Sequence, residues 1–266
     1  MQKSLVKEKL RRGEPTMAFG IRFLDPNLVE MLGFLGFDAV WICNEYKGIN
    51  PLAMEHLVRA ARAAGMEALV RTGVGSRDDI VRFLSVGANA LMVPHVRSAD
   101  DAREIVRRAK YPPLGHRELE TVNADANFGL MGLTDYLKAA NDESLLVVQL
   151  EDAAAIDRAD EIAAVPGIDV LFVGPADLSL SLGMPGEPDH PQVVDLIGRV
   201  VRACEANGVF CGTPALRPEH CRRLMDLGVR YFTHGSDWSL LLKGMRGAKD
   251  AFGELGFTFR EERGGR

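Results

Sequence analysis

VVQLEDAAAIDRADEIAAVPGIDVLFVGPADLS, residues 147–179, predicts a strand, a helix and a second strand in succession. The runs VVQL and DVLFVG are short, apolar and rich in β-branched residues, which is typical of buried strands. Residues 153–164 between them place apolar side chains at helical spacing. Because a strand–helix–strand crossover is right-handed and leaves both strands parallel, the stretch predicts one unit of a parallel α/β fold.

A carboxylate follows each of these strands, Glu151 after the first and Asp177 shortly after the second. Parallel strands end on one face of a sheet or barrel, so we expect the two side chains to lie close together. Adjacent carboxylates repel each other unless they share a proton or bind a divalent cation, and hard oxygen ligands favour magnesium or manganese. Gly174-Pro175 predicts a turn into a helix whose first amides can hold a substrate carboxylate. The alternative is that both acids merely cap helices.

The rest of the chain repeats this alternation. Eight strands are predicted, at residues 16–21, 38–43, 68–71, 90–93, 145–150, 169–173, 209–212 and 231–234. The predicted helices lie at residues 5–10, 26–36, 52–64, 77–86, 99–109, 133–140, 153–164, 191–207, 218–227 and 238–252. The least regular segment, residues 111–129, is rich in proline, glycine and asparagine.

Eight strands alternating with helices over about 250 residues are the signature of a (β/α)8 TIM barrel, an α/β fold with its catalytic groups on the loops after the strands. We expect one such domain over residues 1–266, with a mobile charged tail at residues 260–266. A doubly wound open sheet is the alternative, but Gly73-Val74-Gly75 lacks the third glycine of a nucleotide-binding fingerprint.

The composition excludes several classes of partner. The 266 residues are 47% hydrophobic, which suits one large globular domain, and the net charge of −5 gives no electrostatic reason to expect a nucleic acid or an anionic membrane. The four cysteines lack the spacing of a structural zinc site, and reduced thiols are the simplest interpretation. Residues 1–14 lack the apolar core of a signal peptide and no run reaches the length of a membrane span, so we expect a cytoplasmic protein.

Polar residues at other strand ends are further candidates for the site. Arg71 is either a salt-bridged structural residue or the fork that binds a keto-acid carboxylate or a developing enolate. For His95, which follows Pro94 in a loop, a hydrogen-bonded or exposed position is a simpler interpretation than a ligand. Cys43 is read as a buried apolar residue, since no base accompanies it. The remaining strand-end candidates are Asn44, Glu45, Tyr46 and Gln149.

Several longer motifs are similar to those of a known enzyme family. They are FDAVWICNEY (37–46), VRTGVGS (70–76), VGANALMVPHV (86–96), YPPLGHR (111–117), VVQLED (147–152) and FVGPADLSLSLG (172–183). Through these motifs, nearly the whole chain resembles the HpcH/HpaI aldolases, which are metal-dependent class II carbon–carbon lyases of 2-keto acids.

The resemblance implies a (β/α)8 barrel assembled as a homo-oligomer, a hexamer or trimer of dimers, with exchanged C-terminal helices. It also implies a divalent metal (Mg²⁺, Mn²⁺ or Co²⁺) on Glu151 and Asp177, which pyruvate or oxaloacetate chelates. The substrate carboxylate would lie near the amides of Ala176 and Asp177, with Gln149 assisting. Arg71 matches the arginine that stabilises the enolate in the family.

Two positions depart from the family pattern. Residues 43–46 read Cys-Asn-Glu-Tyr where relatives carry Asp-Gly-Glu-His, so Tyr46 stands in place of the histidine that helps to move the aldol proton. Ser85 stands where an aspartate usually supports that histidine. A free tyrosine with a pKa near 10 is ionised only about one part in a thousand at pH 7. Tyr46 is therefore expected to be a poor base unless a neighbouring cation lowers its pKa, although it can donate a proton.

These departures separate the possible reactions. Cleaving a 4-hydroxy-2-keto acid requires removal of the hydroxyl proton, whereas oxaloacetate forms the same enolate by losing carbon dioxide and needs no base. The sequence predicts a metal-dependent lyase that acts through a pyruvate enolate, with aldol cleavage as its activity. The alternatives are an oxaloacetate decarboxylase or oxaloacetate-dependent condensing enzyme, and a non-catalytic protein that binds keto acids.

Overall fold

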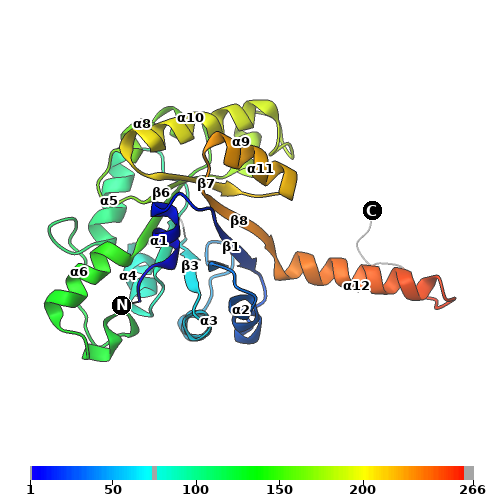
Figure 1. The fold of residues 1–266 in the computed structure, drawn as a ribbon, viewed down its shortest axis with the longest axis horizontal. Helices are drawn as coiled ribbons and strands as arrows, with labels where there is room; N and C mark the ends of the chain where they lie inside the picture. The colour runs from blue at the N-terminus through cyan, green and yellow to red at the C-terminus, as the bar shows by residue number, and fades with distance from the viewer. Residues whose placement is uncertain (1, 74–76, 261–266) are drawn as a thin grey trace.

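Eight parallel strands close into a barrel in the order of the chain, and β8 pairs with β1 to complete it (Figure 1). The computed structural model describes residues 2–73 and 77–260. The strands are β1 (Thr16–Ile21), β2 (Ala39–Cys43), β3 (Glu67–Arg71), β4 (Ala90–Val93), β5 (Leu145–Leu150), β6 (Val170–Val173), β7 (Phe210–Pro214) and β8 (Tyr231–Ser236). This closed order confirms the (β/α)8 barrel, and the open-sheet alternative is wrong.

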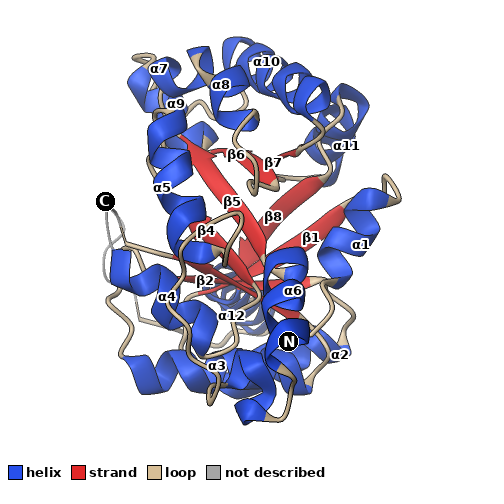
Figure 2. Cartoon of the chain, turned by 90° about the vertical axis from the view of Figure 1, so that its left-hand side faces the viewer, coloured by secondary structure: helices blue, strands red, loops and turns tan. Residues whose placement is uncertain are grey.

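Helices surround the strands, as Figure 2 shows. Several begin where a polar side chain accepts a hydrogen bond from an amide of the first turn, as Asn50, Ser98 and Asp152 do. In chain order the helices are α1 (Leu5–Arg11), α2 (Pro26–Phe34), α3 (Pro51–Ala63), α4 (Arg77–Ser85), α5 (Ala99–Ala109), the 3₁₀ helix η1 (Ala124–Gly129), α6 (Leu133–Glu143), α7 (Ala153–Asp157), α8 (Ala159–Ala163), α9 (Pro175–Ser181), α10 (Pro191–Asn207), α11 (Pro218–Leu227) and α12 (Asp237–Gly253). In the part of the chain that the structure describes, no helix combines the length and the apolar character needed to span a bilayer.

One predicted helix differs in the structure. Residues 153–164 form two short helices, α7 and α8, which meet at Arg158. The backbone of Arg158 (φ −103°, ψ 11°) leaves the helical region, and its amide donates to the Ala155 carbonyl three residues back, which closes a tighter turn. Residues 74–76 of the glycine motif, and the predicted mobile tail apart from Arg260, lie outside the described residues.

Inward-facing apolar side chains fill the barrel, and α1 covers the end at which the strands begin. Val6 and Leu10 of α1 join a cluster inside the barrel that includes Leu69, Val147 and Phe172. A larger apolar cluster lies between the outer face of the strands and the surrounding helices. With the N-terminal ends of the strands covered, the carboxyl ends are left to form a site, as in other barrels of this type.

Glu67, the first residue of β3, fastens α1 to the barrel. Its Oε1 accepts hydrogen bonds from the Ser4 hydroxyl and from the Val6 amide, both at 2.8 Å. The residue is 2% exposed. Burial raises the pKa of the Glu67 carboxyl to about 7, so this contact depends on pH near neutrality.

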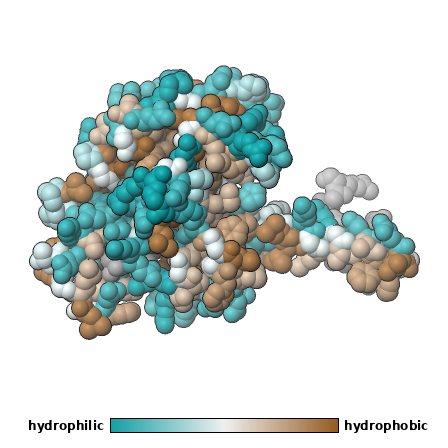
Figure 3. Space-filling model, viewed as in Figure 1, coloured by the Kyte–Doolittle hydropathy of each residue, from teal (hydrophilic) through white to brown (hydrophobic). Residues whose placement is uncertain are grey.

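The C-terminal helix α12 projects away from the barrel (Figure 1). Its first residue, Asp237, is buried and accepts hydrogen bonds from the amides of Arg22 and Phe23 in the loop after β1. Beyond that residue the helix exposes large apolar side chains, and Figure 3 shows brown surface along it. These side chains are Trp238, Leu240, Leu241, Met245 and Phe252. An apolar surface of this extent is typical of an interface between proteins.

Candidate active site

Polar side chains from consecutive strand ends meet at the open mouth of the barrel. β5 and β6 are parallel neighbours, with Gln149 in register with Phe172, so the residues that follow both strands reach the same face. The contacts and charge interactions described below connect Glu45 after β2, Arg71 on β3, His95 after β4, Gln149 and Glu151 at the end of β5, and Asp177 on α9.

Glu151 lies at the centre of this group and is 4% exposed. Its Oε1 accepts a hydrogen bond of 2.6 Å from Gln149 Nε2, and its Oε2 accepts one of 3.0 Å from the His95 amide. Burial raises the pKa of the Glu151 carboxyl above its ordinary value. His95 opposes this rise, and the charges of Asp177 and Glu45 add to it. The charges of Asp177 and Glu45 therefore both act on the Glu151 carboxyl.

His95 turns towards two of these acids. Its backbone lies in the left-handed region at φ 56°, which is uncommon for a residue other than glycine. The ring places Nδ1 3.1 Å from Glu151 Oε2 and Nε2 3.5 Å from Glu45 Oε1, with 36% of the side chain exposed. The side chain is exposed, as one of the two expected positions had it, but its ring faces acids of the site, which the position after Pro94 did not reveal.

Arg71 is ion-paired and also lies in the site. Its Nε is 3.0 Å from Glu45 Oε2, an ion pair whose alignment is too poor for a hydrogen bond. Its Nη1 donates to Gln149 Oε1 at 3.5 Å, and its Nη2 lies 3.1 Å from Cys43 Sγ. This ion pair confirms the salt-bridged interpretation of Arg71, and its role towards a keto acid or an enolate stays a prediction. Cys43 is buried, as expected.

Tyr46 lies over the exposed side of the site. Its ring is 5.2 Å from Arg71 Cζ, and the Trp41 ring is 5.1 Å from the same atom. Tyr46 is 70% exposed. Partial desolvation of the side chain and the charge of Glu45 raise the pKa of Tyr46, and the lowering effect of Arg71 is smaller. The ring therefore covers the guanidinium, while the hydroxyl is a poor base at neutral pH.

Neither Glu151 nor Asp177 caps a helix, so the capping interpretation is wrong. The N-cap residue of α7 is Asp152, whose side chain accepts from the Ala155 amide. The N-cap residue of α9 is Gly174, with no side-chain hydrogen bond. Both strand-end acids are thereby left for another purpose.

Gly174 brings the start of α9 against the acid. A Cβ atom there would lie 2.9 Å from Glu151 Cγ and 3.0 Å from Gln149 Nε2, closer than real side chains allow. The amides of Ala176 and Asp177 precede the first bond of the helix, from the Leu178 amide to the Gly174 carbonyl. These two amides therefore begin the helix close to Glu151, and the binding of a substrate carboxylate by them, which the family resemblance implies, stays a prediction.

The carboxylate oxygens of Glu151 and Asp177 are donors of the kind that hard divalent metals prefer. Among residues 2–73 and 77–260, no group of three or more histidine, cysteine or acidic side chains has the geometry of a metal site. The protein would then supply the carboxylates of Glu151 and Asp177, and substrate oxygens and water would supply the rest. The raised pKa of buried Glu151 is consistent with this role, because a cation relieves repulsion among like charges.

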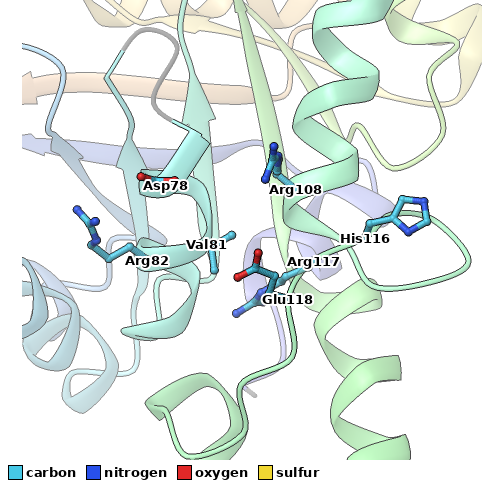
Figure 4. A pocket seen from close by; sticks show the side chains of 7 residues that line it. All are labelled: Asp78, Val81, Arg82, Arg108, His116, Arg117 and Glu118. Carbon is cyan, nitrogen blue, oxygen red and sulfur yellow. The ribbon is translucent and has the colours of Figure 1, made fainter.

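Ser85, the last residue of α4, lies in a different polar cluster. Arg117 Nη2 is 3.5 Å from its Oγ and 2.6 Å from Asp125 Oδ2, with the Arg117 and Asp125 side chains almost fully buried. Figure 4 shows the cavity beside this cluster, where Arg117 lies with Val81 of α4 and Arg108 of α5. None of the residues that line this cavity belongs to the strand-end group.

Comparison with known proteins identifies the family of this chain. A family model described as HpcH/HpaI aldolase/citrate lyase matches residues 25–243. This chain belongs to the HpcH/HpaI aldolase/citrate lyase family. Membership of the HpcH/HpaI family makes it a carbon–carbon lyase, which favours an enzyme over a non-catalytic binding protein.

Individual HpcH/HpaI relatives match over most of their length. The chain is 35% identical over 240 residues to the hydroxypyruvate/pyruvate aldolase of Delftia acidovorans, covering 88% of this chain and 87% of that protein. It is 33% identical over 235 residues to a 2-keto-3-deoxy-L-rhamnonate aldolase of Escherichia coli, with the same coverage. The crystal structure of an HpcH/HpaI aldolase from Desulfitobacterium hafniense superposes with a TM-score of 0.91 at 30% identity, covering 97% of this chain and all of that one. The citrate synthase SbnG superposes with a TM-score of 0.86 at 28% identity, covering 96% and 99%.

Proposed function

We propose that the protein is a divalent-metal-dependent aldolase that releases pyruvate from a 4-hydroxy-2-keto acid. The observation that carries this proposal is the buried carboxyl of Glu151, which shares the mouth of the barrel with Asp177 and contacts the Arg71–Glu45 pair through Gln149 and His95. Two relatives more than 30% identical are named as aldolases of keto acids, which supports the same substrate class.

Each residue of the site has a role in this reaction. Glu151 and Asp177 would hold the metal, which polarises the keto oxygen and stabilises charge that develops on it. Arg71 would donate hydrogen bonds to the developing enolate oxygen, with Gln149 fixing the arginine and Glu151 together. The amides of Ala176 and Asp177 would bind the substrate carboxylate.

The hydroxyl proton requires a separate acceptor. Tyr46 is poorly suited, because its pKa is raised. We assign this contact to His95, whose ring reaches the site from β4 and is partly open to the solvent side. Tyr46 then acts through its ring, by covering the Arg71 guanidinium.

Two assays on metal-stripped protein with and without added Mn²⁺ test these roles. One measures pyruvate release from a 4-hydroxy-2-keto acid and the other the loss of oxaloacetate. Glu151→Gln should abolish both activities. His95→Gln should slow aldol cleavage by about 100-fold and change oxaloacetate decarboxylation little, because that step needs no base. Turnover that is indifferent to Mn²⁺, or that survives Glu151→Gln, would contradict the proposal.

A second candidate is an oxaloacetate decarboxylase or an oxaloacetate-dependent condensing enzyme. The observation that favours it is the raised pKa of Tyr46, since these reactions form the enolate without a base at that position. The structural relative SbnG is named as a citrate synthase. Loss of oxaloacetate with no cleavage of any 4-hydroxy-2-keto acid would identify this function instead.

We also propose that the working form is a cytoplasmic homo-oligomer, a hexamer or trimer of dimers. The support is α12, which leaves the barrel and exposes Trp238, Leu241 and Met245 where a second copy could cover them. The four cysteines are unpaired, which suits a reducing compartment. Light scattering of the full chain and of a chain ending at residue 236 distinguishes an assembly that needs α12 from one that does not.

A further inference from the structure

A cation at the mouth of the barrel has no acidic partner among residues 2–73 and 77–260. Arg22 directly follows β1, is half-buried, and has its Cζ 5.7 Å from the centre of the Trp41 ring. Within the described residues its guanidinium takes part in none of the ion pairs, whereas Arg71, at the same ring, is paired with Glu45. A half-buried guanidinium without a counter-charge is a ready site for an anion.

Trp41 is a common neighbour of the two guanidinium groups. Its indole points into the barrel from β2 and packs on the interior cluster. A Cβ atom at Gly20 would lie only 3.4 Å from Trp41 Cε3 and 2.7 Å from the Gly235 carbonyl oxygen, so glycine leaves room for the ring beneath Arg22. The buried Trp41 Nε1 also lacks a hydrogen-bond acceptor among the described residues. The mouth of the barrel is thus rich in donors around one indole ring.

The backbone around Arg22 is held by hydrogen bonds, while its guanidinium takes part in none of the ion pairs of the described residues. The Arg22 amide donates to Asp237 Oδ1 at 2.6 Å, and the Phe23 amide donates to Asp237 Oδ2 at 2.8 Å. Lys47 Nζ also donates to the Arg22 carbonyl. Because Asp237 is engaged by amides, it anchors the loop and does not pair with the guanidinium. Arg22 is therefore held in place before any ligand arrives, which lowers the entropy cost of binding.

We propose that Arg22 binds an anionic group at the far end of the substrate, a carboxylate or a phosphate on the half that does not become pyruvate. This inference rests on the proposed function, which places the keto-acid end at Glu151 and Arg71. The Cζ atoms of Arg22 and Arg71 lie 5.7 and 5.1 Å from the centre of the same indole ring, so the two arginines line one region of the barrel mouth. The preferred substrates then carry two anionic ends, in contrast to a keto acid with a neutral sugar-like tail.

The test compares ligands that differ only in the distal charge. Calorimetry on the full chain with Mn²⁺ measures the dissociation constants of 2-oxoglutarate and 2-oxopentanoate, which share a five-carbon chain and differ in the terminal carboxylate. Wild type should bind 2-oxoglutarate at least about tenfold more tightly. Arg22→Gln should reduce this preference to less than about twofold, with unchanged binding of 2-oxopentanoate, and Arg22→Lys should keep part of it.

A matched control removes the same charge elsewhere on this end of the barrel. Arg97 follows β4 and is paired with Asp152 at 2.7 Å, so Arg97→Gln should leave the preference intact. Pyruvate addition to glyceraldehyde 3-phosphate and to glyceraldehyde then shows whether a phosphate is preferred over a carboxylate as the distal anion. Binding of 2-oxopentanoate with no preference in wild type, or an equal loss in Arg22→Gln and Arg97→Gln, overturns the inference alone. Failure to bind any keto acid overturns the proposed function and this inference with it.

Discussion

Replacing Glu67 by glutamine should remove a pH dependence from the stability of the barrel. Burial raises the pKa of the Glu67 carboxyl from its ordinary value of 4.5 to about 7. A carboxyl whose pKa is higher in the folded state stabilises the fold in its protonated form. That contribution is complete below about pH 4.5 and is lost as the pH rises through about 7, and a rise of this size corresponds to about 3 kcal/mol.

The assay is urea-induced unfolding of wild type and the Glu67→Gln variant at several pH values between 5 and 8. Glutamine keeps an acceptor for the Ser4 hydroxyl and the Val6 amide, so α1 should stay in place. All other titrating groups are common to both proteins and cancel in the difference between their free energies of unfolding. We expect wild type to lose about 2 to 3 kcal/mol relative to the variant across this range. A difference that stays constant with pH would refute the reasoning.

Three further substitutions test other parts of the structure. Tyr46→Phe should keep aldol activity within about threefold, because the ring and not the hydroxyl covers Arg71. Tyr46→Ala, which removes the ring, should lower kcat about fivefold. Equal losses of the two variants in steady-state assays would show that the hydroxyl matters. Gly174→Ala should weaken Mn²⁺ binding more than tenfold, measured by calorimetry, because its Cβ would displace Glu151 and Gln149; unchanged affinity would contradict this. Asp125→Asn should lower the free energy of unfolding by about 3 kcal/mol, because it leaves the charge of buried Arg117 unpaired; a loss below about 1 kcal/mol in urea titrations would count against it.

The fold could be predicted because its signals are local and repeated. Each strand is a short apolar run, and each helix carries apolar residues at helical spacing. The order of the strands in the barrel follows their order in the chain. Glu151 and Asp177 could be placed on one face for the same reason, since parallel strands share the direction in which they end. The split of one helix at Arg158 could not be read from spacing, because apolar residues continue through it.

The finer contacts of the site depend on geometry that residue types do not encode. His95 reaches Glu151 because its backbone adopts a left-handed conformation at φ 56°, a choice that nothing in the motif around Pro94 indicates. Arg22 has an ordinary position after a strand in the sequence. That Asp237, more than 200 positions later, accepts from backbone amides and does not pair with this guanidinium is visible only in the structure.

β3 begins at Glu67, which anchors α1, and ends at Arg71, which lies in the candidate active site. At about 3.3 Å per residue, the two side chains are separated by roughly 13 Å. Effects of substitutions at such a distance usually add, because the groups share no neighbours. The lower end of the barrel is therefore a place where thermal tolerance can be engineered independently of turnover. In many enzymes a more stable fold costs activity. Here the residues that govern the two properties lie at opposite ends of one strand.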